Sequence, residues 1–213
     1  MNTLRKFIDL TIESLKDNKK LIIGLYLLFI VCFVGAWFLS APRIQTLVSN
    51  ISALSTPTTT PNMANSVGAI ELFISNEFGG IVTYLGSIFF GIPAIVLLMY
   101  NGINIGFQGQ LFNTVIPNGG LKFIVYLIPH GIFEITATVL ESVAGILLFM
   151  FIWKFIKAWR SSETRGVSDS FEKTKKILIQ SIMIFIFSTI LLAIAAPLEA
   201  YFSLPFSQFI LGV

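Results

Sequence analysis

The stretch LIPHGIFEITATVLESVAG, residues 127–145, places a proline, the only histidine of the chain and two glutamates inside an otherwise apolar segment. Elsewhere the chain contains three long runs without any charged residue, Leu21–Leu39, Gly79–Leu121 and Ile177–Leu198. Apolar runs of about 20 residues match the hydrocarbon thickness of a bilayer. The alternating pattern of barrel strands is absent, so these runs need helices to pair their backbone groups. The sequence predicts an all-α, polytopic membrane protein.

The composition supports this class and excludes others. Of 213 residues, 55% are hydrophobic and only 12% are charged, about half the charged fraction that is typical of soluble domains. The basic residues flank the apolar runs, where they act as topology signals, so we expect no nucleic-acid partner. Cys32 is the only cysteine and lies within an apolar run, so a monomer forms no disulfide. We expect a multi-pass protein of the cell membrane.

Basic residues predict the orientation of the chain. They concentrate in the amphipathic N-terminal segment and in the loop at 154–176, and the positive-inside rule places both in the cytoplasm. An even number of spans must then separate them, which gives about five spans in total, the third from about Ile103 to Ile116. The segments are 1–20 (N-terminus), 21–39 (first span), 40–78 (external Ser/Thr/Pro-rich loop), 79–205 (membrane core) and 206–213 (C-terminal tail).

The predicted third span is unusually polar. Asn101, Asn104 and Gln108 recur at helical spacing and share one face, while Gly102 and Gly106 allow another backbone to approach. One interpretation is helix packing through amide hydrogen bonds, and the other is a polar groove for a substrate or ion. We expect broken or re-entrant helices around 101–131, because irregular backbone at membrane depth needs cover from protein or water.

A second polar stripe follows in the opening stretch. His130, Glu134 and Glu141 fall on one face of a helix that starts near Pro129, with Gly131 beside the histidine. A carboxylate at the bilayer centre costs about 2.5–3.5 kcal/mol, so these groups should face the bundle and have partners. We therefore expect the segments around Asn101 and His130 to approach one another.

Known catalytic patterns do not match this chain. One histidine cannot supply the two that a zincin motif needs. An intramembrane aspartyl protease needs two aspartates inside its spans, and all three aspartates of the chain (Asp9, Asp17, Asp169) lie outside the apolar runs. There is no Gly-x-Ser-x-Gly elbow and no glycine-rich phosphate loop followed by lysine. We expect no enzyme, no catalytic residues, no metal site and no cofactor.

Three blocks of the sequence resemble the stage II sporulation protein M family of integral membrane proteins. They are NGINIG at 101–106, IPHGIFEI at 128–135 and AAPLEAYFSLP at 195–205. Residues that match the family pattern include Asn76, Asn101, Gly102, Gly106, Pro129, His130, Gly131, Glu134, Ala137, Glu199, Ala200 and Pro205. The resemblance implies a polytopic protein without recognised catalytic activity. In endospore-forming bacteria the namesake of the family anchors a complex with peptidoglycan-degrading partners during engulfment, and the family extends to organisms that never sporulate.

Two functional hypotheses follow. The first is a non-enzymatic membrane scaffold that recruits partners through its loops. The alternative is a small transporter or channel-like protein with a polar site near the midplane, formed by Asn101, Asn104, Gln108, His130 and Glu134. The expected partners are the lipid bilayer and other membrane or envelope proteins, with a homo-oligomer left open.

Overall fold

The structure, a computed structural model, describes residues 3–54, 68–161 and 166–212, and all regular elements in these ranges are helices. The all-α class predicted from sequence is therefore confirmed. In chain order the elements are α1 (Thr3–Asp17), α2 (Lys19–Leu39), α3 (Ala41–Leu54), α4 (Ala69–Gly86), α5 (Ile92–Val115), α6 (Gly119–Trp159), α7 (Val167–Pro197), the π-helix η1 (Leu198–Phe202) and α8 (Ser203–Leu211).

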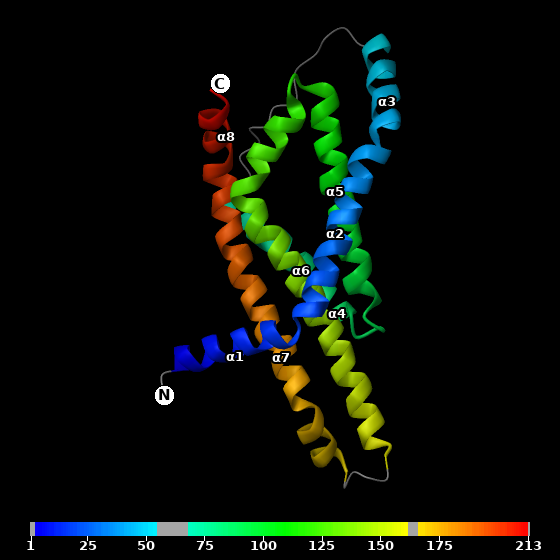
Figure 1. The fold of residues 1–213 in the computed structure, drawn as a ribbon, viewed down its shortest axis with the longest axis vertical. Coiled ribbons are helices and arrows are strands. Elements are labelled where there is room, and N and C mark those ends of the chain that lie inside the picture. The colour runs from blue at the N-terminus through cyan, green and yellow to red at the C-terminus, as the bar shows by residue number, and fades with distance from the viewer. Residues whose placement is uncertain (1–2, 55–67, 162–165, 213) are drawn as a thin grey trace.

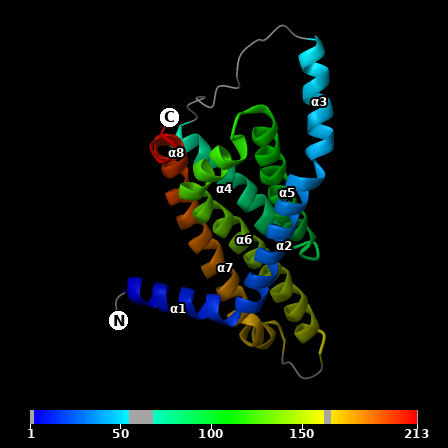
Figure 2. The ribbon, with the colours of Figure 1, turned by 45° about the horizontal axis from the view of Figure 1, so that its top comes forward.

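The bundle is built from α2, α4, α5, α6 and α7. The helix pair α6 and α7 forms its centre, α2 lies on α5 and α6, and α4 packs against α5, α6 and α7. Figure 1 shows α1 lying across the lower end of the bundle, while the C-terminus lies at the opposite end. The turned view in Figure 2 shows α4 behind α6, between α7 and α5.

Four helical segments in the described residues are long and apolar enough to cross a membrane: Lys19–Leu39, Ile92–Val115, Gly119–Trp159 and Val167–Leu211. The outer surface fits an apolar surrounding, because α2 alone exposes Ile23, Leu27, Val31 and Phe38 by more than half. Soluble monomers rarely expose apolar patches of this extent. The protein is therefore a membrane protein.

The second and third helices of the bundle lie earlier in the chain than predicted. We expected both within Gly79–Leu121, the third from about Ile103, but α4 begins at Ala69 and α5 at Ile92. The turn between them is set by Gly91, whose positive φ of 69° is accessible to glycine at little cost, and by Pro93 in the first turn of α5. The prediction was wrong because it placed both helices inside a run without charged residues, whereas α4 contains Glu71 and Glu77.

Three predicted loops are partly helical. The segment 40–78 contains α3, whose Ile44 is buried, and the first half of α4; residues 55–67 lie outside the described ranges. Most of the segment 154–176 belongs to α6 and α7, with 162–165 outside the described ranges. The segment 206–213 continues α8 to Leu211. Helices extend beyond the apolar runs because charged neighbours support them there, as the i,i+4 pair Asp169–Lys173 does on α7.

The interruption expected around 101–131 falls at the turn between α5 and α6. Both helices are continuous where polar residues suggested a break, α5 through Asn101–Gln108 and α6 through Pro129–Gly131. Instead, α6 bends in its upper part (Figure 1). Proline within a helix lacks an N–H and clashes with the carbonyl four residues earlier, which produces such a kink.

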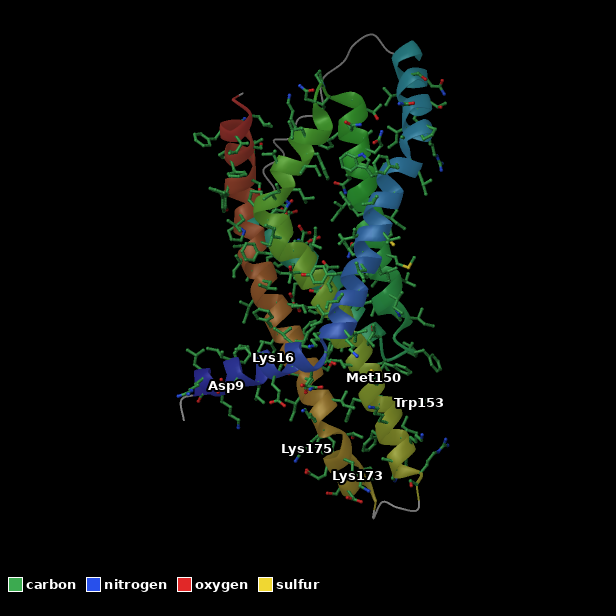
Figure 3. The ribbon with its side chains drawn as sticks, viewed as in Figure 1. Asp9, Lys16, Met150, Trp153, Lys173 and Lys175 are labelled. Atoms are coloured by element: carbon green, nitrogen blue, oxygen red, sulfur yellow. The ribbon has the colours of Figure 1, made fainter. Side chains whose placement is uncertain are left out.

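The N-terminal helix α1 is fixed to α7 by charged groups. The Lys176 ammonium contacts the carboxylates of Glu13 and Asp17, both at 2.9 Å, and the Gln180 amide donates to Asp17 at 2.8 Å. Figure 3 shows the labelled Asp9, Lys16, Lys173 and Lys175 at this end of the molecule. The N-terminal helix and the basic end of α7 therefore share one end of the bundle.

Candidate functional site

A partly open cleft of about 560 Å³ lies between α4, α5 and α6. Each of these helices contributes polar side chains to its walls: Ser75, Asn76 and Thr83 from α4, Asn101, Asn104 and Gln108 from α5, and Glu134, Thr138 and Glu141 from α6. Apolar residues complete the walls, among them Phe29 of α2 and Leu192 of α7. No Lys, Arg or His is found among the described residues that line it. The cleft is therefore polar and acidic.

The two sets of polar and small residues on α5 face in different directions. Asn101, Asn104 and Gln108 line the cleft, and none of their side-chain amides bonds another described residue. Gly102 and Gly106 instead face α2, where an added Cβ would meet the backbone carbonyl of Phe29 or Phe33. The glycines thus bring α2 against α5, while the amide groups face the cleft.

Glu141 is the most deeply buried carboxylate of the cleft. The residue is 4% exposed, and its Oε1 has no hydrogen-bond partner. Gly80 of α4 makes room for it, because a Cβ at that position would overlap the Glu141 carboxylate. Nearly all buried polar groups in proteins are hydrogen-bonded, so an unpartnered carboxylate oxygen in a cleft points to a missing ligand, ion or proton.

A second carboxylate, that of Glu77 on α4, lies near Glu141. Its Oε1 accepts a hydrogen bond from Thr189 of α7 at 2.9 Å, and its Oε2 is buried without a partner. The carboxylates of Glu77 and Glu134 interact electrostatically with that of Glu141. Three acidic groups therefore gather in one part of the bundle without a described cation among them.

The predicted stripe on α6 divides between two environments. Glu134, Thr138 and Glu141 line the cleft, but His130 is buried on the side of α8, where its Nδ1 lies 2.8 Å from the Ser203 hydroxyl. Its Nε2 lies 3.9 Å from Glu134 Oε2. Asn101 and Glu134 thus line the same cleft, whereas His130 does not.

Glu199, predicted as a site residue, lies in η1 beside this histidine. The ligand atoms of His130, Glu134 and Glu199 all lie within 4.8 Å of one another, which is a spacing that could hold a metal ion. The neighbouring Pro129 and Gly131 contribute geometry rather than contacts across helices. Pro129 lies inside α6, and the atoms nearest to a Cβ at Gly131 would belong to Leu127 and Ile135 of its own helix.

Sequence reasoning missed the contribution of α4 to the site. Ser75, Glu77, Gly80 and Thr83 were assigned to a loop or to an apolar span without a role. A signal was present, since Asn76, Gly80, Thr83 and Ser87 recur at i, i+4, i+7 and i+11 and so mark one polar face of a helix. The charge of Glu71 and Glu77 hid this face by suggesting a segment outside the membrane.

Comparisons with known proteins identify the family of this chain. The stage II sporulation protein M family matches residues 24–204, which include α4 to α7 and η1. Uncharacterized protein MJ0793 of Methanocaldococcus jannaschii is 34% identical over 128 residues, 59% of this chain and 65% of that protein, so the match spans slightly less than two thirds of the relative.

A second relative from the same organism, uncharacterized protein MJ0706, is 27% identical over 194 residues, which cover 87% of this chain and 86% of that protein. No solved structure matches the chain. The family match covers most of the chain, including every helix that lines the cleft. The chain therefore belongs to the stage II sporulation protein M family.

Proposed function

We propose that the chain binds a small organic cation, such as an alkylamine, in the cleft between α4, α5 and α6, and carries it through the membrane. The observation that supports this most directly is the buried carboxylate of Glu141, a residue of the cleft wall whose Oε1 has no hydrogen-bond partner. This is the transporter-like alternative of the sequence analysis, with Glu141 in place of His130 as the central ionisable group.

The chemistry of the walls favours a cation with N–H groups. Carboxylates at bilayer depth are stabilised by an opposite charge, and no described basic side chain lines the cleft to supply one. The carbonyl oxygens of Asn101, Asn104 and Gln108 are free to accept hydrogen bonds from an ammonium group. A volume of about 560 Å³ lies in the range of small-molecule sites and exceeds what a bare ion fills.

The proposal includes an orientation in the cell membrane. The basic segment at 154–176 and the N-terminal helix would face the cytoplasm, and the C-terminus would lie outside, with α2, α4, α5, α6 and α7 as five passes. Support comes from the fold, in which α1 and the basic end of α7 lie at one end and the C-terminus at the other (Figure 1). Helix α4, with 18 residues the shortest of the five, is not among the four segments named above as long and apolar enough to cross a membrane, and it packs against α5, α6 and α7.

We propose that the protein binds its ligand without catalysing a reaction. We also propose that it contacts lipid and other membrane or envelope proteins. The scaffold role implied by the family resemblance stays a prediction, because a scaffold does not need an acidic cleft. The two roles predict different effects of replacing Glu141. A scaffold tolerates its replacement by glutamine, whereas a cation carrier loses its ligand.

The test is ligand-dependent thermal stability of the purified chain in detergent, with the protonated alkylamines putrescine and butylamine as probes. A ligand at 100 times its Kd adds about 2.7 kcal/mol, or roughly 5–10 °C in Tm. We expect such a rise for the wild type and for Glu71→Gln, which removes an exposed carboxylate outside the cleft. Glu141→Gln and Asn101→Leu should abolish the rise.

Two results contradict the proposal. One is a wild-type protein whose Tm does not respond to either amine, and the other is an equal response of the wild type and Glu141→Gln. A positive response is followed by uptake of labelled putrescine into proteoliposomes. Binding without uptake would restrict the function to binding and remove the carrier role.

A further inference from the structure

We propose that His130, Glu134 and Glu199 form a binding site for a divalent transition-metal cation. The site goes beyond the cleft, because His130 and Glu199 do not line the cleft and only Glu134 belongs to both. It rests on the geometry of three donors from α6 and η1, and it does not depend on an amine being the ligand of the cleft.

The three residues meet because of two local features of the backbone. His130 and Glu134 are one turn apart on α6, directly after the proline that bends this helix. Glu199 lies in η1, a five-residue π-helix that follows α7. Single π turns often mark functional sites, because the widened turn redirects side chains. Here the donor atoms come within 4.8 Å of one another.

The imidazole of His130 is held in one orientation. Ser203 donates its single hydroxyl proton to the Leu198 carbonyl at 3.0 Å, so its oxygen accepts a hydrogen bond from His130 Nδ1–H at 2.8 Å. Tyr126 packs edge-on against the ring, with centroids 5.3 Å apart. Metal-binding histidines are typically fixed in this way, with the second ring nitrogen donating to a protein oxygen.

This hydrogen-bond arrangement leaves the Nε2 lone pair facing acidic groups. Glu134 Oε2 lies 3.9 Å from Nε2, too far for a hydrogen bond, and no described residue donates a hydrogen bond to the Glu199 carboxylate. Lone pairs and carboxylates that converge on one point repel one another unless a cation lies between them. A bound metal ion supplies that cation and satisfies all three donors.

The donor set indicates the kind of ion. Imidazole suits Zn²⁺, Fe²⁺ and related ions, while carboxylates also suit Mn²⁺, so one histidine with two glutamates favours a first-row divalent metal over Ca²⁺ or Mg²⁺. Two donors on a tetrahedral ion at about 2.1 Å lie roughly 3.4 Å apart. Small side-chain rotations suffice to bring the observed donors to that spacing.

Glu134 connects the metal site to the cleft. Its Oε1 accepts a hydrogen bond from Asn76 Nδ2 of α4 at 3.4 Å, while Oε2 faces His130. One carboxylate thus has one oxygen toward each site. A metal ion on Oε2 would draw Glu134 toward η1 and change the charge at the edge of the cleft.

The test uses tag-free, full-length protein in detergent after treatment with a chelator, titrated with Co²⁺ while the visible absorption of the ion is recorded. We expect saturable binding, with competition by Zn²⁺, in the wild type and in the matched control Glu71→Gln. His130→Ala and Glu199→Gln should abolish saturable binding. Ser203→Ala should weaken it by about 10- to 100-fold, because the residue positions the imidazole without contacting the metal.

A measurement on the wild-type protein tests the metal site even if the variants fail to fold. His130 is the only histidine of the chain, so pulsed EPR of bound Cu²⁺ should show the coupling of a single imidazole. No saturable Co²⁺ binding by the wild type, binding by His130→Ala equal to that of the wild type, or Cu²⁺ without imidazole coupling would each overturn the site. The amine response of the cleft is measured separately on the wild type, so either proposal can fail alone.

Discussion

Gly80 of α4 faces Glu141 of α6 so closely that a methyl group on the glycine would overlap the carboxylate. This pair explains how an acidic side chain that is 4% exposed can sit between two helices and still reach the cleft. The neighbouring Gly79 has no atom within 4 Å of an added Cβ. The two adjacent glycines therefore provide a matched test of the site.

Gly80→Ala should displace Glu141 and lower stability by about 1–3 kcal/mol, which is typical of overpacking. It should also remove the Tm response to putrescine. Gly79→Ala should leave stability unchanged or slightly raise it through helix propensity. Thermal unfolding with and without the amine measures both quantities, and equal behaviour of the two variants would refute a specific role for the Gly80–Glu141 contact.

The contact of α2 with α5 should depend on glycine at 106. A Cβ there would overlap the carbonyl of Phe33, a backbone atom that cannot rotate away. Gly106→Ala should therefore cost about 1–3 kcal/mol. Gly35→Ala on α2 is the control, because nothing lies within 4 Å of its added Cβ. Chemical denaturation in detergent compares the two, and a neutral Gly106→Ala would show that α2 does not pack as described.

His130 and Glu134 should be energetically coupled when metal is removed by a chelator. In the metal-free protein the effects of His130→Phe and Glu134→Gln on stability should not add, and the double variant should deviate from the sum of the single variants by a coupling energy of about 0.5–3 kcal/mol. Each single variant leaves the other polar group buried without its neighbour. The same cycle with Glu71 should be additive within roughly 0.5 kcal/mol, and additivity in both cycles would exclude direct coupling.

The docking of α1 on α7 should persist across a wide pH range. The Lys176 ammonium, together with the Gln180 amide, holds the pKa of Asp17 below its usual 3.8, so this contribution is present above that pH and lost as pH falls through the lowered value. The two carboxylates raise the pKa of Lys176 above 10.5, so its contribution is lost only when pH rises through the raised value. Docking should thus hold from about pH 4 to pH 10.

Spin labels at Lys6→Cys and Ser168→Cys, in a Cys32→Ser background, measure this docking by distance. Lys176→Gln should broaden the distance distribution at pH 7, and Lys175→Gln should not, because Lys175 pairs with Glu172 on its own helix. High salt should act in the same direction as Lys176→Gln, since exposed ion pairs are screened. A distribution unaffected by Lys176→Gln would assign the docking to apolar contacts alone.

The proposed orientation predicts unequal labelling from outside the cell. Single cysteines at Ser49 in α3 and Ser168 in α7, both exposed positions, are placed in the Cys32→Ser background. An impermeant thiol reagent should label Ser49→Cys in intact cells and Ser168→Cys only after lysis. Single cysteines at Thr59 and Ser162, labelled in the same way, extend the test to segments beyond the described residues. Equal labelling of both ends would overturn the orientation.

The class of the molecule and many residues of the cleft could be predicted from the amino-acid sequence alone. Uncharged apolar runs predict membrane helices because backbone groups in hydrocarbon must bond within the segment. Helical spacing alone predicted that Asn101, Asn104 and Gln108 share a face, and they line one wall of the cleft. The family resemblance rested on short blocks of residues, and the family match over residues 24–204 agrees with it.

Which of these polar groups lie together depends on how the helices pack in three dimensions. Spacing placed His130, Glu134 and Glu141 on one stripe, but the histidine lies against Ser203 of α8, while the two glutamates line the cleft. The sequences of α4 and η1 do not indicate which helices pack against them. The contact of Gly80 with Glu141 and the position of Glu199 beside His130 therefore follow only from the packing. Sequence periodicity fixes the face of a helix, whereas the partner of that face depends on long-range packing that no local pattern encodes.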